Sequence, residues 1–255
     1  MINSKSLKNT RFFGAFLGAC LLSAALLNNA LKASTDAVLE SAHHEHTEAF
    51  NLGSLFGSND INFENFPMAP VEELAKQVAG NLQSGIKNPI HVVSVFRKEL
   101  TPLAAVSRTA GMCIIVLNKN PDGWAQWNRF FKEIDESERM NMVEVSIAHE
   151  IGHCADVQTS KEAGLDLSKK SALSGEVFAD IFASLYAKSE MGERSQTALN
   201  TLNHVRSEFS FTESSHATGD KLQALSSKIE AFNAQKIAAP RLTQFAFELN
   251  SSLAI

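Results

Sequence analysis

Apolar residues recur at helical spacing over most of the chain after residue 70. From this spacing we expect helices over Val71–Leu82, Trp124–Ile134, Thr197–Phe209, Lys221–Phe232 and, with a weaker pattern, Arg241–Leu249. Two stretches rich in β-branched residues predict strands instead. The first is His91–Phe96, and the second lies within Val106–Leu117 and stops at a turn of sequence Asn-Pro-Asp-Gly at 120–123.

A further helix is expected around residues 142–151, where apolar side chains occupy several faces, as in a buried helix. Asp135 and Glu138 offer a capping box at its start. Gly152 is a poor helix former, costing roughly 1 kcal/mol against Ala. A glycine there makes sense if another backbone, or a bound group, needs room beside the helix.

Residues 149–153 of this helix read H-E-x-x-H. Residues four apart share one helix face, so His149 and His153 can bind one metal ion, and Glu150 can act on a metal-bound water. Chance alone would produce such a match in about one chain in a hundred. The surrounding sequence therefore has to decide between a metal site and coincidence.

A third ligand is available downstream, where residues 176–180 read E-x-x-A-D. Glu176 and Asp180 are four apart and share a helix face. Ala179 and Ala183 are small enough to let this helix approach the first one closely. Ser174 is a reasonable N-cap, which would put Glu176 in the first turn. The alternative is an ordinary amphipathic helix with two solvated acids.

H-E-x-x-H followed by E-x-x-A-D resembles the gluzincin branch of the zincin metallopeptidases, and most of all the CAAX prenyl endopeptidase and HtpX-like family. The resemblance spans about residues 100–220. It implies one zinc ion held by His149, His153 and Glu176, with Glu150 as general base. It also implies that Asp180 holds a ligand histidine by its other ring nitrogen. Integral-membrane members of that family carry several membrane spans, whereas none is expected here beyond the N-terminus.

The resemblance implies a mainly helical α+β zincin-like domain over residues 71–255, with a small sheet whose edge strand flanks the active-site helix. Gly111 to Asn118 would be that edge, and Gly111, Cys113 and Ile115 would bind an extended substrate as an added strand. The alternative is that this segment is a plain core strand.

Peptide hydrolysis also requires a donor for the developing oxyanion. Tyr186 falls away from the Glu176 face at helical spacing, which leaves His204, Arg206 and His216. The family carries a histidine before a helix at a similar place, so the resemblance favours His216. A surface histidine in a polar loop is the other interpretation.

The N-terminus reads as a targeting segment, because Lys5, Lys8 and Arg11 precede the uncharged stretch Phe12–Leu27. We expect residues 1–33 to be a cleaved signal peptide or a single membrane anchor, so that the body is periplasmic or secreted. Residues 34–70 resemble a flexible leader, with a pro-segment as one option. Its tract His43–His46 could bind zinc, although a solvated tail is the simpler interpretation.

Outside the signal, the chain has two cysteines, Cys113 and Cys154. In an oxidising compartment they could form a disulfide between the proposed edge strand and the active helix, or they could remain buried thiols. The chain has a formal net charge of -5 and no basic patch, which argues against nucleic acid as a partner.

The sequence therefore predicts a zinc metallopeptidase that hydrolyses a peptide or protein substrate. The competing hypothesis is a non-catalytic zincin-fold module that docks a partner along its edge strand. An intact Glu150 argues against the second, since a structural site has no need of a base.

Overall fold

The computed structural model describes residues 68–96, 102–106, 112–124, 136–208, 216–232 and 237–253. Its helices are α2 (Met68–Leu82), α4 (Glu136–Glu162), α5 (Ala172–Glu190), α6 (Ser195–Glu208), α7 (Gly219–Ala231) and α8 (Ala239–Ser251). Short 3-10 helices are η2 (Gln83–Gly85), η3 (Leu167–Lys169) and η4 (Gly192–Arg194). The strands are β1 (Ile90–Val95), β2 (Leu103–Val106) and β3 (Cys113–Asn118). The fold is α+β and mainly helical, as the sequence predicts.

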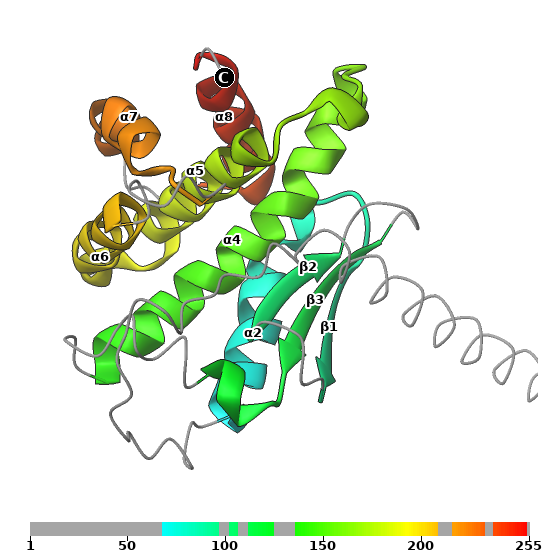
Figure 1. Cartoon of the computed structure of the whole chain (residues 1–255), viewed down its shortest axis with the longest axis vertical. Helices are drawn as coiled ribbons and strands as arrows, with labels where there is room; N and C mark the ends of the chain where they lie inside the picture. Colours follow the sequence, from blue (N-terminus) through cyan, green and yellow to red (C-terminus); the bar gives the residue numbers. More distant parts are fainter. Residues whose placement is uncertain are drawn as a thin grey trace, which may run out of the picture. The chain divides into compact units, whose positions relative to one another are not determined.

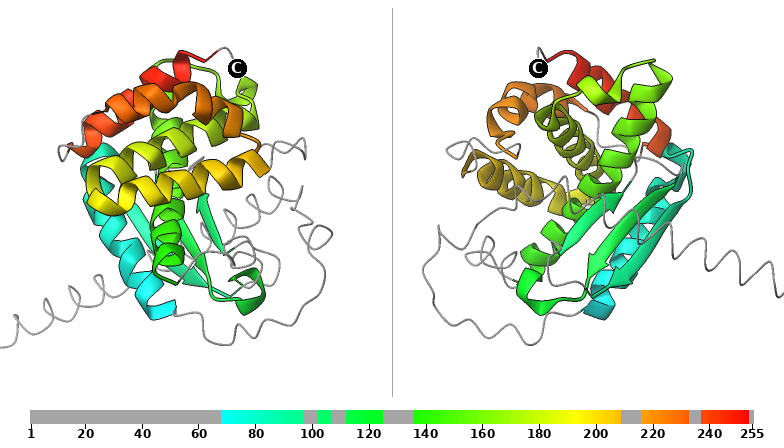
Figure 2. Two further views of the ribbon diagram at one scale, coloured as in Figure 1. Left: turned by 90° about the vertical axis from the view of Figure 1, so that its left-hand side faces the viewer. Right: turned by 45° about the vertical axis from the view of Figure 1, so that its right-hand side comes forward.

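Helix α4 is the central element of the fold. It lies between the sheet on one side and α5 and α6 on the other (Figures 1 and 2). Its most extensive partner is α5, and it also contacts α2, α8, β2 and β3. A helix with neighbours on so many sides must be apolar on several faces, which is what the sequence pattern indicates.

The three strands form one mixed sheet in the order β1-β3-β2. Strand β3 pairs parallel with β1 and antiparallel with β2, and all six of its residues are buried. The prediction that Gly111 to Asn118 forms the sheet edge is therefore wrong for Cys113 and Ile115, which lie in the central strand; Gly111 lies outside the described residues. Among the described strands, the edge that contacts α4 is β2.

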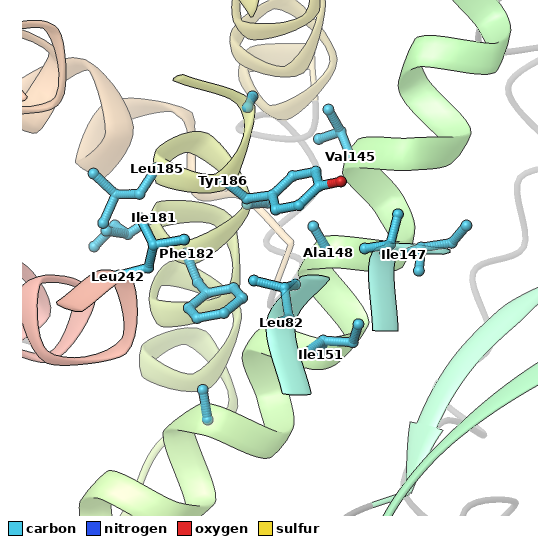
Figure 3. Close-up of a cluster of buried hydrophobic side chains, with 14 of the residues drawn as sticks. Leu82, Val145, Ile147, Ala148, Ile151, Ile181, Phe182, Leu185, Tyr186 and Leu242 are labelled. Atoms are coloured by element: carbon cyan, nitrogen blue, oxygen red, sulfur yellow. The ribbon is translucent and has the colours of Figure 1, made fainter. Parts of the chain in front are cut away.

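The main core lies where α5 crosses α4. Phe182 and Tyr186 point from α5 toward α4, with Val145 and Ile151 of α4 and Leu82 of α2 close by (Figure 3). Every residue of α5 from 176 to 187 is buried. Because α5 is buried on all faces, any polar group on it needs a partner within the protein.

The ends of α4 and α5 follow local sequence signals. Helix α5 begins three residues before the position expected from Ser174, because Ser171 is the N-cap and its hydroxyl accepts a hydrogen bond from Ser174 N at 3.1 Å. Glu176 is consequently in the second turn, not the first. Just after α4, Gly164 takes a positive φ of 69°, a conformation that favours glycine.

The other predicted elements agree with the structure to within a few residues, except where the residues are not described. The helix expected over Trp124–Ile134 lies almost entirely outside the described residues, as do the signal or anchor at 1–33 and most of the leader at 34–70. Within the described part of the chain, no helix has the length and apolarity needed to cross a membrane.

Candidate metal centre

Helix α4 brings both histidines of the H-E-x-x-H motif to one point. The Nε2 atoms of His149 and His153 are 3.1 Å apart, and the two rings meet edge to face. The His149 side chain is 9% exposed, and that of His153 24%. One helical turn therefore presents two imidazole nitrogens, partly open to solvent on the His153 side.

Glu176 reaches the same point from α5. Its Oε2 lies 3.3 Å from His149 Nε2, and its Oε1 lies 3.5 Å from His153 Nε2. One ligand atom from each of the three residues lies within 4.8 Å of the others. His149, His153 and Glu176 thus form a buried group that could hold a metal ion.

The close approach of the two helices depends on Gly152. A Cβ at this position would lie 2.9 Å from Ala179 Cα and 3.2 Å from Ala179 O. A glycine on α4 against a small residue on α5 lets the two backbones come close enough for Glu176 to reach the histidines. The sequence suggested this reason for the glycine, and the contact identifies the neighbouring backbone as that of Ala179.

The three side chains fit a tetrahedral ion. With zinc–nitrogen and zinc–oxygen bonds near 2.1 Å, ligand atoms in a tetrahedral site are about 3.4 Å apart. The Nε2 atoms of the two histidines are 3.1 Å apart and His149 Nε2 lies 3.3 Å from Glu176 Oε2, both near that value, whereas His153 lies 3.5 Å from the other carboxylate oxygen, Oε1. In addition, Glu176 Oε2 is buried and accepts no well-aligned hydrogen bond from the described residues. A metal ion would satisfy a buried carboxylate oxygen left in this way, so the donor set suits a metal.

Asp180 fixes the orientation of His149. Its Oδ1 lies 2.8 Å from His149 Nδ1, the position that the resemblance implies for it. When His149 Nδ1–H donates a hydrogen bond to Asp180, Nε2 is the nitrogen left to bind a metal once the ring is neutral, and it faces Glu176 and His153. The ligand atom of His149 is thus selected by a carboxylate one helical turn beyond Glu176.

The charges in this cluster shift the protonation of its members. Burial opposes charge on His149, but Asp180 and then Glu176 raise its pKa to about 10. Burial likewise opposes charge on Asp180, yet Arg206 and His149 lower its pKa to about 2. The pKa of Glu176 also falls well below its usual value despite burial, because of His153 and His149. Burial lowers the pKa of His153, which leaves that ring neutral near pH 7.

Two further residues bind Asp180 that sequence reasoning did not assign to it. Arg206 of α6 donates from Nη2 to Asp180 Oδ1 at 2.8 Å, and Thr218 donates from Oγ1 to Asp180 Oδ2 at 2.5 Å. The sequence suggested Arg206 only as an oxyanion donor, and it suggested no role for Thr218. No local pattern could have linked them, because the contacts depend on how α6 and α7 pack.

The structure also places His216 beside the cluster. Its Nε2 lies 3.5 Å from Glu176 Oε2, and burial lowers the pKa of its ring, so it is neutral near pH 7. By contrast, His204 is exposed on α6. Tyr186 donates to Glu144 at 3.0 Å within the core, consistent with its expected position away from the Glu176 face. Of the donors considered from sequence, His216 lies nearest the ligand carboxylate.

Glu150 lies between the two histidines and is half-buried. Its negative charge favours the protonated forms of both His153 and Arg206. Glu150 therefore belongs to the same cluster without being one of the three grouped ligands.

A disulfide joins Cys113 of β3 to Cys154 of α4, with Cα atoms 5.6 Å apart. Cys154 directly follows His153, so the bond connects the central strand to the turn of α4 that carries His149 and His153. The sequence allowed either this disulfide or two free thiols, and the structure has the disulfide.

Comparison of the chain with protein-family models, with curated proteins and with solved structures gave no match. The inference about function therefore depends on the geometry of the site and on the motif.

Proposed function

We propose that this protein is a zinc-dependent peptidase that hydrolyses peptide bonds outside the cytoplasm. The observation that carries the proposal is the convergence of His149, His153 and Glu176 within reach of one metal ion. Glu150 directly follows His149 on the same helix. Two neutral imidazoles and one carboxylate are a ligand set of catalytic zinc sites, which leave a coordination position open. Zinc held there supplies a Lewis acid that polarises a carbonyl and lowers the pKa of a water toward about 7.

The chain's own residues supply the remaining chemistry. Glu150 accepts the proton of the attacking water and later gives it to the leaving amine. His216, neutral and next to Glu176, donates a hydrogen bond to the oxygen that becomes negatively charged. Asp180 keeps the Nε2 of His149 directed at the ligand position throughout.

An extended peptide substrate would pair with the sheet edge next to α4. That edge is β2, because β3 is already paired on both sides. Main-chain hydrogen bonds to β2 would hold the peptide across the metal centre with little demand on side-chain identity. The proposed substrate-binding strand is therefore Leu103–Val106, in place of Gly111 to Asn118, which the resemblance implied.

The disulfide supports a location outside the cytoplasm. Disulfides persist in oxidising compartments and are rare in the cytosol, where thiols are kept reduced. The basic and apolar N-terminal segment is in keeping with export.

Glu150→Gln tests the peptidase assignment. The amide cannot accept the proton, so cleavage of denatured, dye-labelled casein should fall about 10²–10⁴-fold, while zinc content stays that of the wild type. Glu162→Gln is the matched control, since Glu162 is an exposed carboxylate on the same helix, and it should cleave at the wild-type rate. Wild-type turnover by Glu150→Gln would contradict the proposal. A zinc-loaded wild type that cleaves nothing would favour the binding module.

A further inference from the structure

The carboxylate of Asp180 divides its two oxygens between different partners. Oδ1 contacts His149 and Arg206, each at 2.8 Å, whereas Oδ2 accepts from Thr218. Asp180 and Thr218 are both fully buried. Within the part of the chain that is described, the Thr218 hydroxyl is the hydrogen-bond donor at Oδ2. A carboxylate bound at both oxygens cannot rotate, so Thr218 contributes to the direction in which Asp180 presents Oδ1.

The Thr218 side chain does not make the hydrogen bond that is usual for a threonine at a helix N-cap. It is the N-cap of α7, where a threonine hydroxyl ordinarily accepts from the first free N–H groups of the helix. Here its side chain makes no capping hydrogen bond. The hydroxyl crosses to Asp180 on another helix instead. Using it there leaves α7 without a side-chain cap, so this contact is made at the expense of helix stability.

The residue after Thr218 explains how α7 comes so near. A Cβ on Gly219 would lie 2.8 Å from both N and Cα of Ser207, the residue that follows Arg206 on α6. Glycine at this position lets the start of α7 lie directly against the end of α6. That contact brings Arg206 and Thr218 to the two oxygens of one carboxylate.

Thr218 is also tied to the turn that carries His216. Thr218 N donates to His216 O at 2.8 Å, and His216 Nε2 lies 3.5 Å from Glu176 Oε2. Thr218 thus makes two contacts with the site. Its side chain binds the carboxylate that orients His149, and its backbone binds the segment that holds His216 beside Glu176.

We infer that Thr218 is a positioning residue of the metal centre, which acts through Asp180 on His149 and through its backbone on His216. The inference rests on the proposed zinc site and adds a role outside the ligand set. Loss of the hydroxyl leaves Asp180 Oδ2 buried without a donor from the described residues. The carboxylate is then free to turn, and the lone pair of His149 is no longer fixed toward the metal.

The test compares Thr218→Val, which keeps the shape and removes the hydroxyl, with Thr218→Ser, which keeps the hydroxyl. Thr243→Val is the matched control, because Thr243 is a buried threonine on α8 whose hydroxyl bonds Gly85 O and Ala239 O, in another part of the fold. Zinc affinity of the folded full-length proteins is measured by competition with a chelator. The visible spectrum of each cobalt-substituted protein reports the ligand geometry.

We expect Thr218→Val to bind zinc about tenfold more weakly or worse, with a shifted cobalt spectrum. Thr218→Ser should stay within about threefold of the wild type, and Thr243→Val should lose stability without losing zinc affinity. If the wild type binds zinc and Thr218→Val has the same zinc affinity and the same cobalt spectrum, the positioning role alone is overturned. A wild type that binds no zinc would overturn the proposed function together with it.

Discussion

At the scale of single residues, the centre depends on Asp180 as much as on the ligands. One buried carboxylate accepts from His149, Arg206 and Thr218, which come from three different segments. Arg206 compensates its charge, so the pKa of Asp180 stays low enough for the anion to persist in the core. Because a buried anion without donors would be costly, each of the three partners helps to keep Asp180 charged in the core.

Asp180→Asn should therefore weaken zinc binding by about 10–100-fold. The neutral amide cannot replace the charged carboxylate that accepts a hydrogen bond from His149 Nδ1. The measurement is chelator competition, with circular dichroism to establish that the variant is folded. Glu144→Gln is the control, since Glu144 is a buried carboxylate of α4 bonded to Tyr186 and Arg194 and takes no part in the metal cluster. Unchanged zinc affinity in Asp180→Asn would show that His149 needs no carboxylate partner.

Zinc binding should become stronger as pH rises. In the metal-free protein the pKa of His149 is about 10, so the ring carries a proton near pH 7 that must leave before Nε2 can bind a metal. The lowered pKa of His153 and of Glu176 means that neither has a proton to lose there. Apparent affinity should thus rise about tenfold per pH unit between pH 7 and 8. Calorimetry in buffers of different ionisation enthalpy should detect about one released proton; no release would contradict this charge assignment.

The residues of the candidate metal centre could be predicted from sequence, whereas Arg206 and Thr218, which bind Asp180, could not. His149 and His153 share one helical turn, and Glu176 and Asp180 share another, so helical spacing alone places each pair on one face. Arg206 and Thr218 reach Asp180 only through the packing of α6 and α7, where Gly219 meets Ser207. Contacts of that kind have no periodic signature in the chain.

At the scale of elements, the crossing of α4 and α5 decides whether a site exists. Gly152→Ala would place a Cβ 2.9 Å from Ala179 Cα and push the helices apart. We expect a loss of about 1–3 kcal/mol in unfolding free energy by urea titration, together with weaker zinc binding. Gly80→Ala on α2 is the control, because nothing lies within 4 Å of its added Cβ, and it should be neutral or stabilising by up to about 1 kcal/mol. Equal stability of both variants would contradict the close approach.

Strand order shows the limit of prediction at this scale. The strands β1 and β3 were predicted from their β-branched residues, whereas β2, with sequence Leu-Ala-Ala-Val directly after Pro102, was missed. Once β2 pairs with β3, the predicted edge becomes the centre of the sheet. The uninterrupted apolar run at 112–117 is typical of a strand buried on both faces, but only the pairing distinguishes it from an edge.

At the scale of the molecule, the disulfide ties the sheet to the helix that carries the candidate metal centre. Cys113 and Cys154 are 41 residues apart, so the bridge restricts the unfolded chain considerably. Replacing both by alanine should lower the unfolding free energy by about 2–4 kcal/mol. Dithiothreitol should destabilise the wild type similarly and leave the double variant unaffected. Identical urea curves for the oxidised and reduced wild type would contradict a stabilising bridge.

The most direct test of the metal centre is the zinc content of the purified, folded protein after zinc supplementation and removal of free metal. Three convergent ligands predict about one zinc per chain, lost or much weakened in both His149→Ala and Glu176→Ala. A folded wild type without zinc, or variants that retain it as the wild type does, would contradict the metal centre on which the proposed peptidase depends.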